Sequence, residues 1–272
     1  MTLTDYFEKG TVSSRLWFYS NYHCNLACTY CLTESSPSSP KRLFSTDQMR
    51  TLALEAKEMG FTALGITGGE PFLVPQIENT IAELADILPI TVLTNGTLFN
   101  QRRLASLAQL SGKDVRFQIS LDSHIPSIND EMRGPENFAK VVDAVPKLIE
   151  LGIQVRIAST LEAIDDIEEL KSFVNGLGIP EEDHIVRHIV QRGRAQDSNL
   201  GQFANFERFP PELTLTSEGA FWTPFGPTYR NGRLQTDLLI CRTVSPLRKP
   251  VGQLLNIVGH SDLDLDNQEG FV

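Results

Sequence analysis

The sequence contains little cysteine and no long apolar run. Only four of its 272 residues are cysteine, and three of them, Cys24, Cys28 and Cys31, lie within one stretch of eight residues. A secreted disulfide framework does not have this spacing. No segment approaches the roughly 18 unbroken apolar residues of a membrane helix, and residues 1–10 lack the basic start and apolar run of a signal peptide. We therefore expect a cytoplasmic protein that does not enter a membrane.

Positive charge is also scarce. The chain has 24 lysines and arginines against 34 aspartates and glutamates, which gives a formal charge of −10 and a pI near 5.0. Because nucleic-acid binding depends on clustered positive charge, a nucleic-acid partner is not expected. Hydrophobic residues make up 41% and charged residues 21% of the chain, ordinary values for a globular protein with a substantial core.

The main positive signal is an alternation of strand-like and helix-like segments. Apolar or β-branched runs predict six strands: Arg15–Asn21, Thr62–Thr67, Ile90–Thr94, Val115–Leu121, Gln154–Ser159 and His184–Val190. Helical patterns lie between them, at Thr46–Met59 with a capping box formed by Ser45 and Gln48, and at Gln76–Leu88, Gln101–Leu110, Asn137–Leu151 and Asp165–Leu177. Strict alternation implies parallel strands joined by right-handed crossovers. The sheet is then either doubly wound or curled into part of a barrel.

The amino-acid composition changes after the sixth predicted strand. Residues 195–235 are rich in proline, glycine, asparagine and phenylalanine, and apolar runs follow at Leu238–Cys241 and Leu254–Val258. We interpret residues 196–272 as an extension that packs on the α/β domain rather than as an independent domain. Residues 261–272 carry four acids and no base, which is typical of a solvated end.

The three close cysteines begin where the first predicted strand ends. Thiolates are soft ligands that suit zinc or iron–sulfur clusters. A structural zinc site needs a fourth ligand, and no second paired motif supplies one; His23 could do so only awkwardly because it is adjacent to Cys24. An iron–sulfur cluster with three cysteine ligands would leave one iron open to a substrate or cofactor. Both metal readings remain open at this point.

The spacing C-x3-C-x2-C, with Tyr30 just before Cys31, resembles the motif of the radical S-adenosylmethionine (radical SAM) superfamily. The resemblance implies a partial (β/α)6 TIM-like barrel. It also implies a [4Fe–4S] cluster held by Cys24, Cys28 and Cys31, whose open iron binds S-adenosylmethionine (SAM). In that family one electron cleaves SAM to a 5′-deoxyadenosyl radical, which abstracts hydrogen from the substrate.

Further motifs fall at the exits of successive predicted strands, where parallel α/β folds bind ligands. Gly68, Gly69, Glu70 and Pro71 resemble the GGEP motif that contacts the SAM amino group, although a plain strand-exit turn has the same composition. Two later segments resemble MoaA- and SPASM-type maturases. They contain Thr94 with Asn95, and Ser120 with Asp122, the latter pair suited to a ribose diol; a cap or polar turn is the alternative.

Weaker matches continue beyond these motifs. Arg156 and Ser159 lie on the strand that the family often uses for adenine or carboxylate contacts, and Arg133 precedes a glycine as in many relatives. A solvent-facing arginine is the alternative for Arg133. Arg192–Ala195 resembles the segment that closes the catalytic core. The resemblance covers about residues 13–195, so we expect a core at 1–195 and an extension at 196–272.

The extension departs from many relatives, which carry auxiliary clusters there. Residues 196–272 contain one cysteine, Cys241, so a complete cysteine-ligated auxiliary cluster is not expected within this chain. Cys241 could instead be the hydrogen donor that quenches a substrate radical. The alternative is a buried cysteine in an apolar strand.

We therefore expect a radical SAM enzyme that abstracts hydrogen from a C–H bond of a small metabolite, sugar or peptide. Epimerisation or another redox-neutral modification fits the lack of auxiliary cysteines best. An external one-electron reductant such as flavodoxin or ferredoxin is implied. The alternatives are an activase that installs a glycyl radical on a partner protein, and a non-enzymatic metal-binding structural or regulatory protein.

Overall fold

A computed structural model describes residues 2–163, 167–203, 210–222, 226–230 and 232–266, without the side chains of residues 260–266. Its centre is a run of six parallel strands that are neighbours in chain order. They are β1 (Arg15–Tyr19), β2 (Ala63–Thr67), β3 (Ile90–Thr94), β4 (Val115–Ser120), β5 (Gln154–Leu161) and β6 (His184–His188). All six predicted strands are present, with ends that differ by at most two residues. The predicted α/β class is confirmed.

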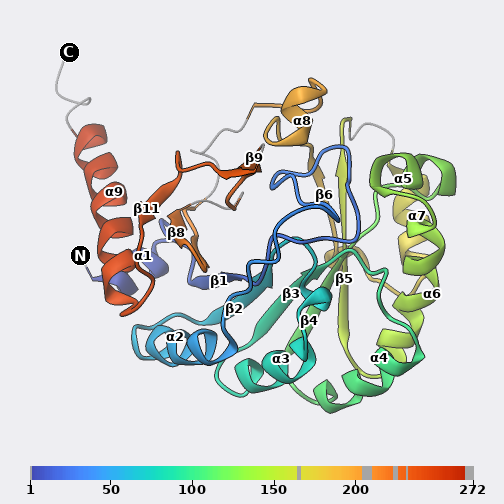
Figure 1. Ribbon diagram of the computed structural model, residues 1–272, viewed down its shortest axis with the longest axis horizontal. Helices are drawn as coiled ribbons and strands as arrows, with labels where there is room; N and C mark the ends of the chain where they lie inside the picture. The colour runs from blue at the N-terminus through green and yellow to red at the C-terminus, as the bar shows by residue number, and fades with distance from the viewer. Residues whose placement is uncertain (1, 164–166, 204–209, 223–225, 231, 267–272) are drawn as a thin grey trace.

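Helices follow the strands and cover the outside of the sheet (Figure 1). They are α2 (Thr46–Glu58), α3 (Ile77–Ala85), α4 (Gln101–Leu107), α5 (Pro126–Arg133), α6 (Asn137–Glu150) and α7 (Glu168–Gly176), with short 3-10 turns at Pro71–Leu73, Ala108–Leu110 and Glu181–Asp183. Helix α5 buries Asn129 and Arg133, whereas the other helices bury apolar side chains against the sheet in one continuous core. Residues 164–166, at the predicted start of the last of these helices, lie outside the described residues.

Several local expectations were wrong or incomplete. Ser45 precedes α2, but its side chain makes no capping hydrogen bond, so the predicted capping box is absent. The sequence pattern also missed the helices α1 (Leu3–Glu8), α5 and α8 (Arg194–Asp197), and it missed the strands β7 (Leu213–Thr216) and β8 (Gly219–Trp222). These elements are short, and periodicity is a weak signal over four to eight residues.

Alternate residues of each strand face the helices or the hollow inner side of the curved sheet, which we call the lumen. Leu16 and Phe18 of β1 face the helices and are fully buried, while the residues between them face the lumen. Paired residues of parallel strands share a face, so the register carries this division around the sheet: Trp17 pairs with Gly65, and Gln118 pairs with Arg156. The lumen face therefore combines polar and charged residues, such as Gln118 and Arg156, with apolar ones such as Trp17.

The C-terminal segment extends this sheet beyond β1 (Figure 1). Strand β7 pairs in parallel with β1, β8 pairs antiparallel with β7, and the edge strand β11 (Leu239–Cys241) pairs antiparallel with β8. A small hairpin of β9 (Tyr229–Arg230) and β10 (Arg233–Leu234) and the helix α9 (Arg248–Asp266) complete the segment. The predicted run Leu254–Val258 lies within α9, as do residues 261–266 of the predicted solvated end, and residues 267–272 lie outside the described residues. The division at residue 195 stays a prediction.

None of the helices in the described part of the chain is both long and apolar enough to cross a bilayer.

Candidate active site

The cysteines lie on the long connection between β1 and α2, which we call the cysteine loop (residues 20–45). The loop crosses the carboxyl ends of the parallel strands (Figure 1). Cys24 is buried, whereas Cys28 and Cys31 are partly exposed, and all four cysteines of the chain are free thiols. The backbone N–H of Leu26 points at the Cys24 sulfur at 3.4 Å, and the Asn95 side-chain amide does so at 3.7 Å.

The thiols have a shared electrostatic environment. Burial, together with the nearby charges of Glu70, Cys28 and Cys31, raises the pKa of Cys24 to about 12. Burial also raises the pKa of Cys28, against the opposing effect of Arg133. Both groups are therefore neutral thiols near pH 7 in the chain alone. Ligation to a metal centre would deprotonate them, because thiolates are the ligating form.

The predicted GGEP turn is fixed to the cysteine loop through its backbone. The Gly69 N–H donates to the Asn21 carbonyl at 2.9 Å, and the Glu70 N–H donates to the His23 carbonyl at 2.9 Å. A Cβ at Gly69 would lie 2.2 Å from the His23 carbonyl oxygen, so only glycine permits this approach. Gly68 has φ of +148°, and a Cβ there would also lie too close to Asn21. Pro71 begins the short 3-10 turn that follows.

Glu70 is fully buried, and its carboxylate forms hydrogen bonds within the protein. Its carboxylate accepts hydrogen bonds from the Phe72 N–H at 3.0 Å, the Thr94 hydroxyl at 2.8 Å and the Asn95 N–H at 2.8 Å. Burial raises the pKa of Glu70, and these three hydrogen bonds oppose that rise. The side chain thus joins the ends of β2 and β3. Its direct contact with a SAM ammonium stays a prediction.

A relay of buried asparagine amides, which the sequence analysis missed, links the same edge of the sheet. Asn95 donates to Asn25 at 2.9 Å, Asn137 donates to the Asn95 carbonyl at 3.3 Å, and Asn129 donates to Asn137 at 2.9 Å. Asn129 also accepts from the Asp122 N–H at 3.0 Å. Asn129 and Asn137 are fully buried in α5 and α6. Single asparagines in helices give no distinctive sequence pattern, so no signal in the sequence indicated this relay.

Tyr30, Asp122 and Arg133 form a buried cluster that we call the tyrosine–aspartate–arginine triad. The Tyr30 hydroxyl donates to Asp122 Oδ2 at 2.5 Å, and Arg133 Nη1 donates to the same oxygen at 3.1 Å and to the Tyr30 oxygen at 2.5 Å. Asp122 Oδ1 accepts from the Thr160 N–H at 2.9 Å. Arg133 is 6% exposed, so the expected alternative of a solvent-facing arginine does not hold.

The triad fixes the cysteine loop to the ends of β4 and β5. Burial raises the pKa of Tyr30 well above its usual value, so the phenol stays neutral and can donate. Burial alone would lower the pKa of Arg133, but Tyr30, Cys28 and Asp122 together raise it. The C-terminal end of α5 also holds the backbone of the cysteine loop, because the Thr29 N–H donates to the Met132 carbonyl at 2.9 Å. Sequence reasoning found all three residues but assigned them to cofactor contact.

A second clamp comes from the Arg192–Ala195 segment after β6. The Arg194 N–H donates to the Cys31 carbonyl at 3.1 Å, and its guanidinium donates to the Cys28 carbonyl at 2.6 Å and to the Ser35 carbonyl. Arg192 donates to the Thr228 hydroxyl at 2.7 Å, which in turn donates to the Leu32 carbonyl at 2.9 Å. The core and the C-terminal segment therefore meet on the cysteine loop.

Gly193 is the tightest point of this clamp. It has φ of +61° and ψ of −134°, and a Cβ there would lie 2.4 Å from the Leu32 carbonyl oxygen. We expect Gly193→Ala to lower the free energy of unfolding by about 2 kcal/mol or more, because a strained backbone and a clash add together. Urea titration measures this, and Gly112→Ala is the matched control: Gly112 has φ of +77° with open space around it. Equal losses in the two variants would contradict the clamp.

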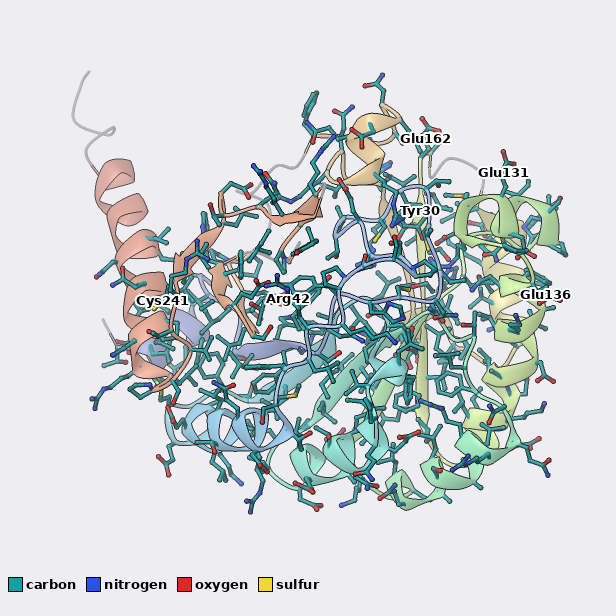
Figure 2. The ribbon with its side chains drawn as sticks, viewed as in Figure 1. Tyr30, Arg42, Glu131, Glu136, Glu162 and Cys241 are labelled. Carbon is teal, nitrogen blue, oxygen red and sulfur yellow. The ribbon has the colours of Figure 1, made fainter. Side chains whose placement is uncertain are left out.

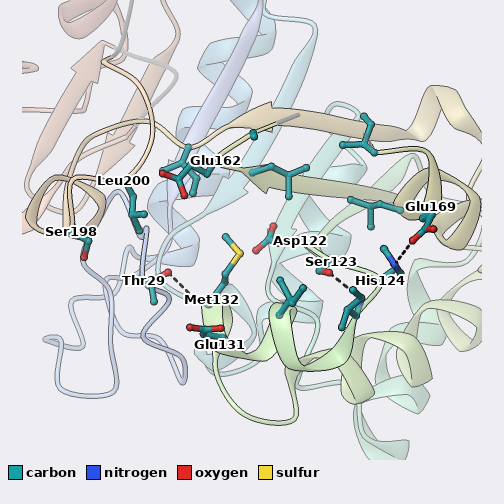
Figure 3. A pocket seen from close by; sticks show the side chains of 17 residues that line it. Thr29, Asp122, Ser123, His124, Glu131, Met132, Glu162, Glu169, Ser198 and Leu200 are labelled. Carbon is teal, nitrogen blue, oxygen red and sulfur yellow. Dashed lines mark hydrogen bonds and ion pairs between the residues drawn. The ribbon is translucent and has the colours of Figure 1, made fainter. Parts of the chain in front are cut away.

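A cavity of about 580 Å³ lies beside the triad at the ends of β4, β5 and β6. Its lining includes Thr29, Asp122, Leu161, Ile189, Glu131, Glu162 and Ser198. Figure 3 shows Asp122, Met132 and Glu162 around this cavity, and the contact between His124 and Glu169, at 3.1 Å, in its wall. The cavity combines apolar walls with hydrogen-bonding groups, which suits a small organic ligand.

The remaining predicted residues lie in different places. Ser120 faces the lumen, and its hydroxyl has no hydrogen bond to the described residues. Arg156 also faces the lumen but donates to Asp183, before β6, at 3.3 Å. Ser159 is fully buried, donates to the Leu121 carbonyl at 2.5 Å and contacts the His184 ring at 2.9 Å. The positions of Arg156 and Ser159 do not support contact with SAM, which stays a prediction.

Cys241 lies far from the cysteine loop. It is in the edge strand β11, it packs against the hydrophobic core, and its sulfur contacts the Thr243 hydroxyl at 3.4 Å. Figure 2 shows Cys241 near α9 and well separated from Tyr30. Its partner Ala220 pairs with Leu215 of β7, whose side chain shares the helix-facing side with Leu16 of β1. This placement favours the packing interpretation and does not support a hydrogen donor.

We expect Cys241→Ala to keep substrate turnover within about twofold of the unchanged enzyme, because the thiol faces away from the lumen. Stability should fall by about 1 kcal/mol from the lost packing. Product formation and urea unfolding measure the two effects. A variant that cleaves SAM normally but forms no product would restore the donor hypothesis.

The donor set of the cysteine loop fits an iron–sulfur cluster. Within the described residues, no three His, Cys, Asp or Glu side chains are grouped tightly enough to hold a single metal ion. The cysteines nonetheless lie close enough for the charges of Cys28 and Cys31 to affect Cys24, and an N–H and a side-chain amide point at its sulfur. Hydrogen bonds to sulfur are a usual feature of iron–sulfur sites. Fold and site together define a partial α/β barrel protein with an iron–sulfur centre at the carboxyl ends of its strands.

Comparison with known proteins identifies the family. The family model that describes the sequences of the radical SAM superfamily matches residues 19–182. The chain belongs to this superfamily. It is accordingly an enzyme whose cofactors are a [4Fe–4S] cluster and SAM, and it lies in the MoaA-like branch. The chain is 34% identical over 241 residues to molybdenum cofactor biosynthesis protein 1 of Bos taurus. It is 30% identical over 185 residues to mycofactocin maturase MftC of Mycolicibacterium smegmatis.

Solved structures show the same fold. Streptococcus suis SuiB bound to S-adenosylmethionine superposes with a TM-score of 0.57 at 21% identity, over 68% of this chain and 43% of that chain. The sequence matches cover 82% of this chain and 37% of the bovine protein, and 65% of this chain and 45% of the mycobacterial one. The chain thus spans less than half the length of these relatives.

Proposed function

We propose that this radical SAM enzyme carries out a redox-neutral modification, such as epimerisation, of a small molecule or peptide. The cluster and SAM would supply a 5′-deoxyadenosyl radical that removes hydrogen from the substrate. The protein's own residues would hold SAM between the GGEP turn and the cavity beside the triad. Gly68 and Gly69 would give backbone access, while Ser120 would offer a free hydroxyl. An external one-electron reductant, such as flavodoxin or ferredoxin, would be the partner.

The cavity supports the SAM-binding part of the proposal. It adjoins Thr29 of the cysteine loop and lies over the ends of three neighbouring strands. Its wall includes the apolar side chains of Leu161 and Ile189, which could hold a flat base, and Ser123, which could bond a polar edge. Asp122 is already committed to Tyr30, Arg133 and Thr160, so we assign it to positioning rather than to a ribose diol.

One observation supports the redox-neutral part. Residues 196–272 contain a single cysteine, and it lies in an edge strand remote from the cysteine loop. A net oxidation of substrate needs an electron acceptor, and this chain cannot ligate a second cluster with cysteines alone. Hydrogen abstraction followed by hydrogen return needs no such acceptor. The returned hydrogen would come from a donor other than Cys241.

The test combines iron analysis with product analysis. Anaerobic reconstitution should give about four iron atoms per chain, as for one [4Fe–4S] cluster. Reduction in the presence of SAM should release 5′-deoxyadenosine and methionine in equal amounts. Two or more clusters per chain would overturn the redox-neutral proposal but leave radical chemistry intact. A colourless, zinc-loaded protein that does not cleave SAM would contradict both.

A further inference from the structure

We infer that Arg103 of α4 is a positioning residue for SAM, which acts by holding the GGEP turn from the outer, helix-covered side of the sheet. The arginine itself would not touch the cofactor. It contacts the 3-10 turn Pro71–Leu73, which begins at the last residue of the GGEP motif. The inference rests on the part of the proposed function that places SAM at the GGEP turn, and it adds a residue that no sequence motif indicates.

Arg103 holds the 3-10 turn through a buried carbonyl group. Its Nη1 atom donates to the Phe72 carbonyl at 2.7 Å. Phe72 is only 1% exposed, and a carbonyl group that is shielded from water needs a hydrogen-bond partner within the protein. A charged donor makes a stronger hydrogen bond than a neutral one. The guanidinium group therefore fixes the backbone of the turn.

The guanidinium group also lies against the Phe72 side chain. Its central carbon is 5.3 Å from the centroid of the Phe72 ring, a cation–π arrangement. The ring packs edge-on against two core rings, with centroids 4.8 Å away for Phe99 and 5.4 Å away for Phe117. Arg103 thus contacts both the backbone and the ring of a residue that is anchored in the core.

Phe72 transmits this constraint to the GGEP turn. Its N–H donates to Glu70 Oε1 at 3.0 Å, one of the three hydrogen bonds that hold the Glu70 carboxylate. The charge of Arg103 also opposes the effect of burial, which raises the pKa of Glu70. A looser 3-10 turn would free one side of this carboxylate. It would therefore also loosen the GGEP turn beside the cysteine loop.

Glu78 of α3 orients Arg103 for this contact. Its Oε1 atom lies 3.4 Å from Arg103 Nη1, and the side chains of Glu78 and Arg103 are 12% and 24% exposed. Solvent screens such a partly buried ion pair less than a surface pair. The carboxylate offsets part of the cost of burying the guanidinium group, and it keeps that group next to the 3-10 turn.

The neighbouring Arg102 provides a matched control. Both arginines belong to α4, and both line the same hollow of about 400 Å³ between α3 and α4. In the part of the chain that the structure describes, the Arg102 guanidinium forms no ion pair and no hydrogen bond, unlike that of Arg103. A change at Arg102 therefore removes the same group from the same helix without altering the contact with Phe72.

The test measures SAM affinity and SAM cleavage separately on the cluster-loaded protein. Calorimetry with the oxidised protein gives the dissociation constant of SAM, and 5′-deoxyadenosine release at saturating SAM gives the rate of cleavage. We expect Arg103→Met to weaken SAM binding by about tenfold, while iron content and the saturated rate stay within about twofold. Arg103→Lys keeps the charge and a donor and should recover part of the affinity. Arg102→Met should bind SAM normally.

A purely structural role for Arg103 predicts a different result. Lower stability would reduce the folded fraction and the iron content, but the protein that remains folded would bind SAM with unchanged affinity. Glu78→Gln serves as a second variant if Arg103→Met does not fold, and it should weaken SAM binding by about threefold. Unchanged SAM affinity in folded Arg103→Met, or in Glu78→Gln where that variant takes its place, would overturn the inference.

Glu70→Gln separates this inference from the proposed function. If it weakens SAM binding while Arg103→Met does not, the GGEP turn holds SAM and only the role of Arg103 is wrong. If neither change weakens binding, the placement of SAM at the GGEP turn is wrong as well. Equal weakening by Arg102→Met and Arg103→Met would also overturn the inference, because the effect would then not depend on the contact with Phe72.

Discussion

Replacing Cys28 by Ser is expected to lower 5′-deoxyadenosine formation by at least about a hundredfold. The cluster needs all three thiolates, and serine is a poor ligand for iron in such clusters. Cys28 lies against the Arg133 carbonyl at 3.6 Å, so the change also alters the contact between the cysteine loop and α5. Iron content and the anaerobic release of 5′-deoxyadenosine measure the loss.

Cys241→Ser is the matched control, because it makes the same chemical change in the only cysteine outside the loop. It should retain iron and SAM cleavage at the level of the unchanged protein. Far-ultraviolet circular dichroism should show that both variants are folded. A Cys28→Ser protein with full iron content and normal SAM cleavage would contradict the assignment of that ligand.

The six parallel strands could be predicted because buried strands in α/β proteins are continuous apolar runs. The runs at β3 and β4 end within one residue of their expected limits. The strands β7 and β8 could not be predicted, because they are four residues long and lie in a segment rich in proline and glycine. Strand β7 pairs with β1, which is far away in sequence, and a local pattern contains no information about such pairing.

The site was predicted in outline but not in its internal bonding. Motif spacing found Glu70, Asp122 and Arg133, since their residue types follow the strand ends where ligands bind. It could not show that their polar groups are used within the chain. Glu70 accepts hydrogen bonds from Phe72 in the following 3-10 turn and from Thr94 and Asn95 at the end of β3, and Asp122 pairs with Arg133. The asparagine relay was missed because single asparagines on helices have no distinctive pattern.

These contacts indicate how the cysteine loop keeps one conformation without help from regular structure. It has hydrogen bonds of its own, such as those from the Cys24 N–H to the Ser36 carbonyl and from the Phe44 N–H to the Ser20 carbonyl, and its backbone is also held from outside. The GGEP turn fixes its start through His23, while α5 and Arg194 fix its central part through Thr29 and Cys31. A loop that must present three ligands to one cluster needs such outer support, because misplacing one ligand weakens the whole site.

The second large effect is expected from Asp122→Ala. The change leaves the Arg133 charge buried without its carboxylate, and breaking a buried ion pair in this way costs about 3–5 kcal/mol. It also removes the acceptor of the Tyr30 hydroxyl. We expect the free energy of unfolding to fall by that amount, as measured by urea titration, and SAM to bind more weakly as the cysteine loop loosens.

The exposed pair of Asp143 and Lys147 on α6, at 2.6 Å, is the matched control for this prediction. Asp143→Ala also removes a carboxylate from an ion pair, but this pair is exposed to solvent, where an ion pair contributes about 0–1 kcal/mol. The double variant Asp122→Ala with Arg133→Met should recover part of the loss, because it leaves no unpaired charge. If Asp122→Ala cost no more than Asp143→Ala, the triad could not be what holds the cysteine loop against β4.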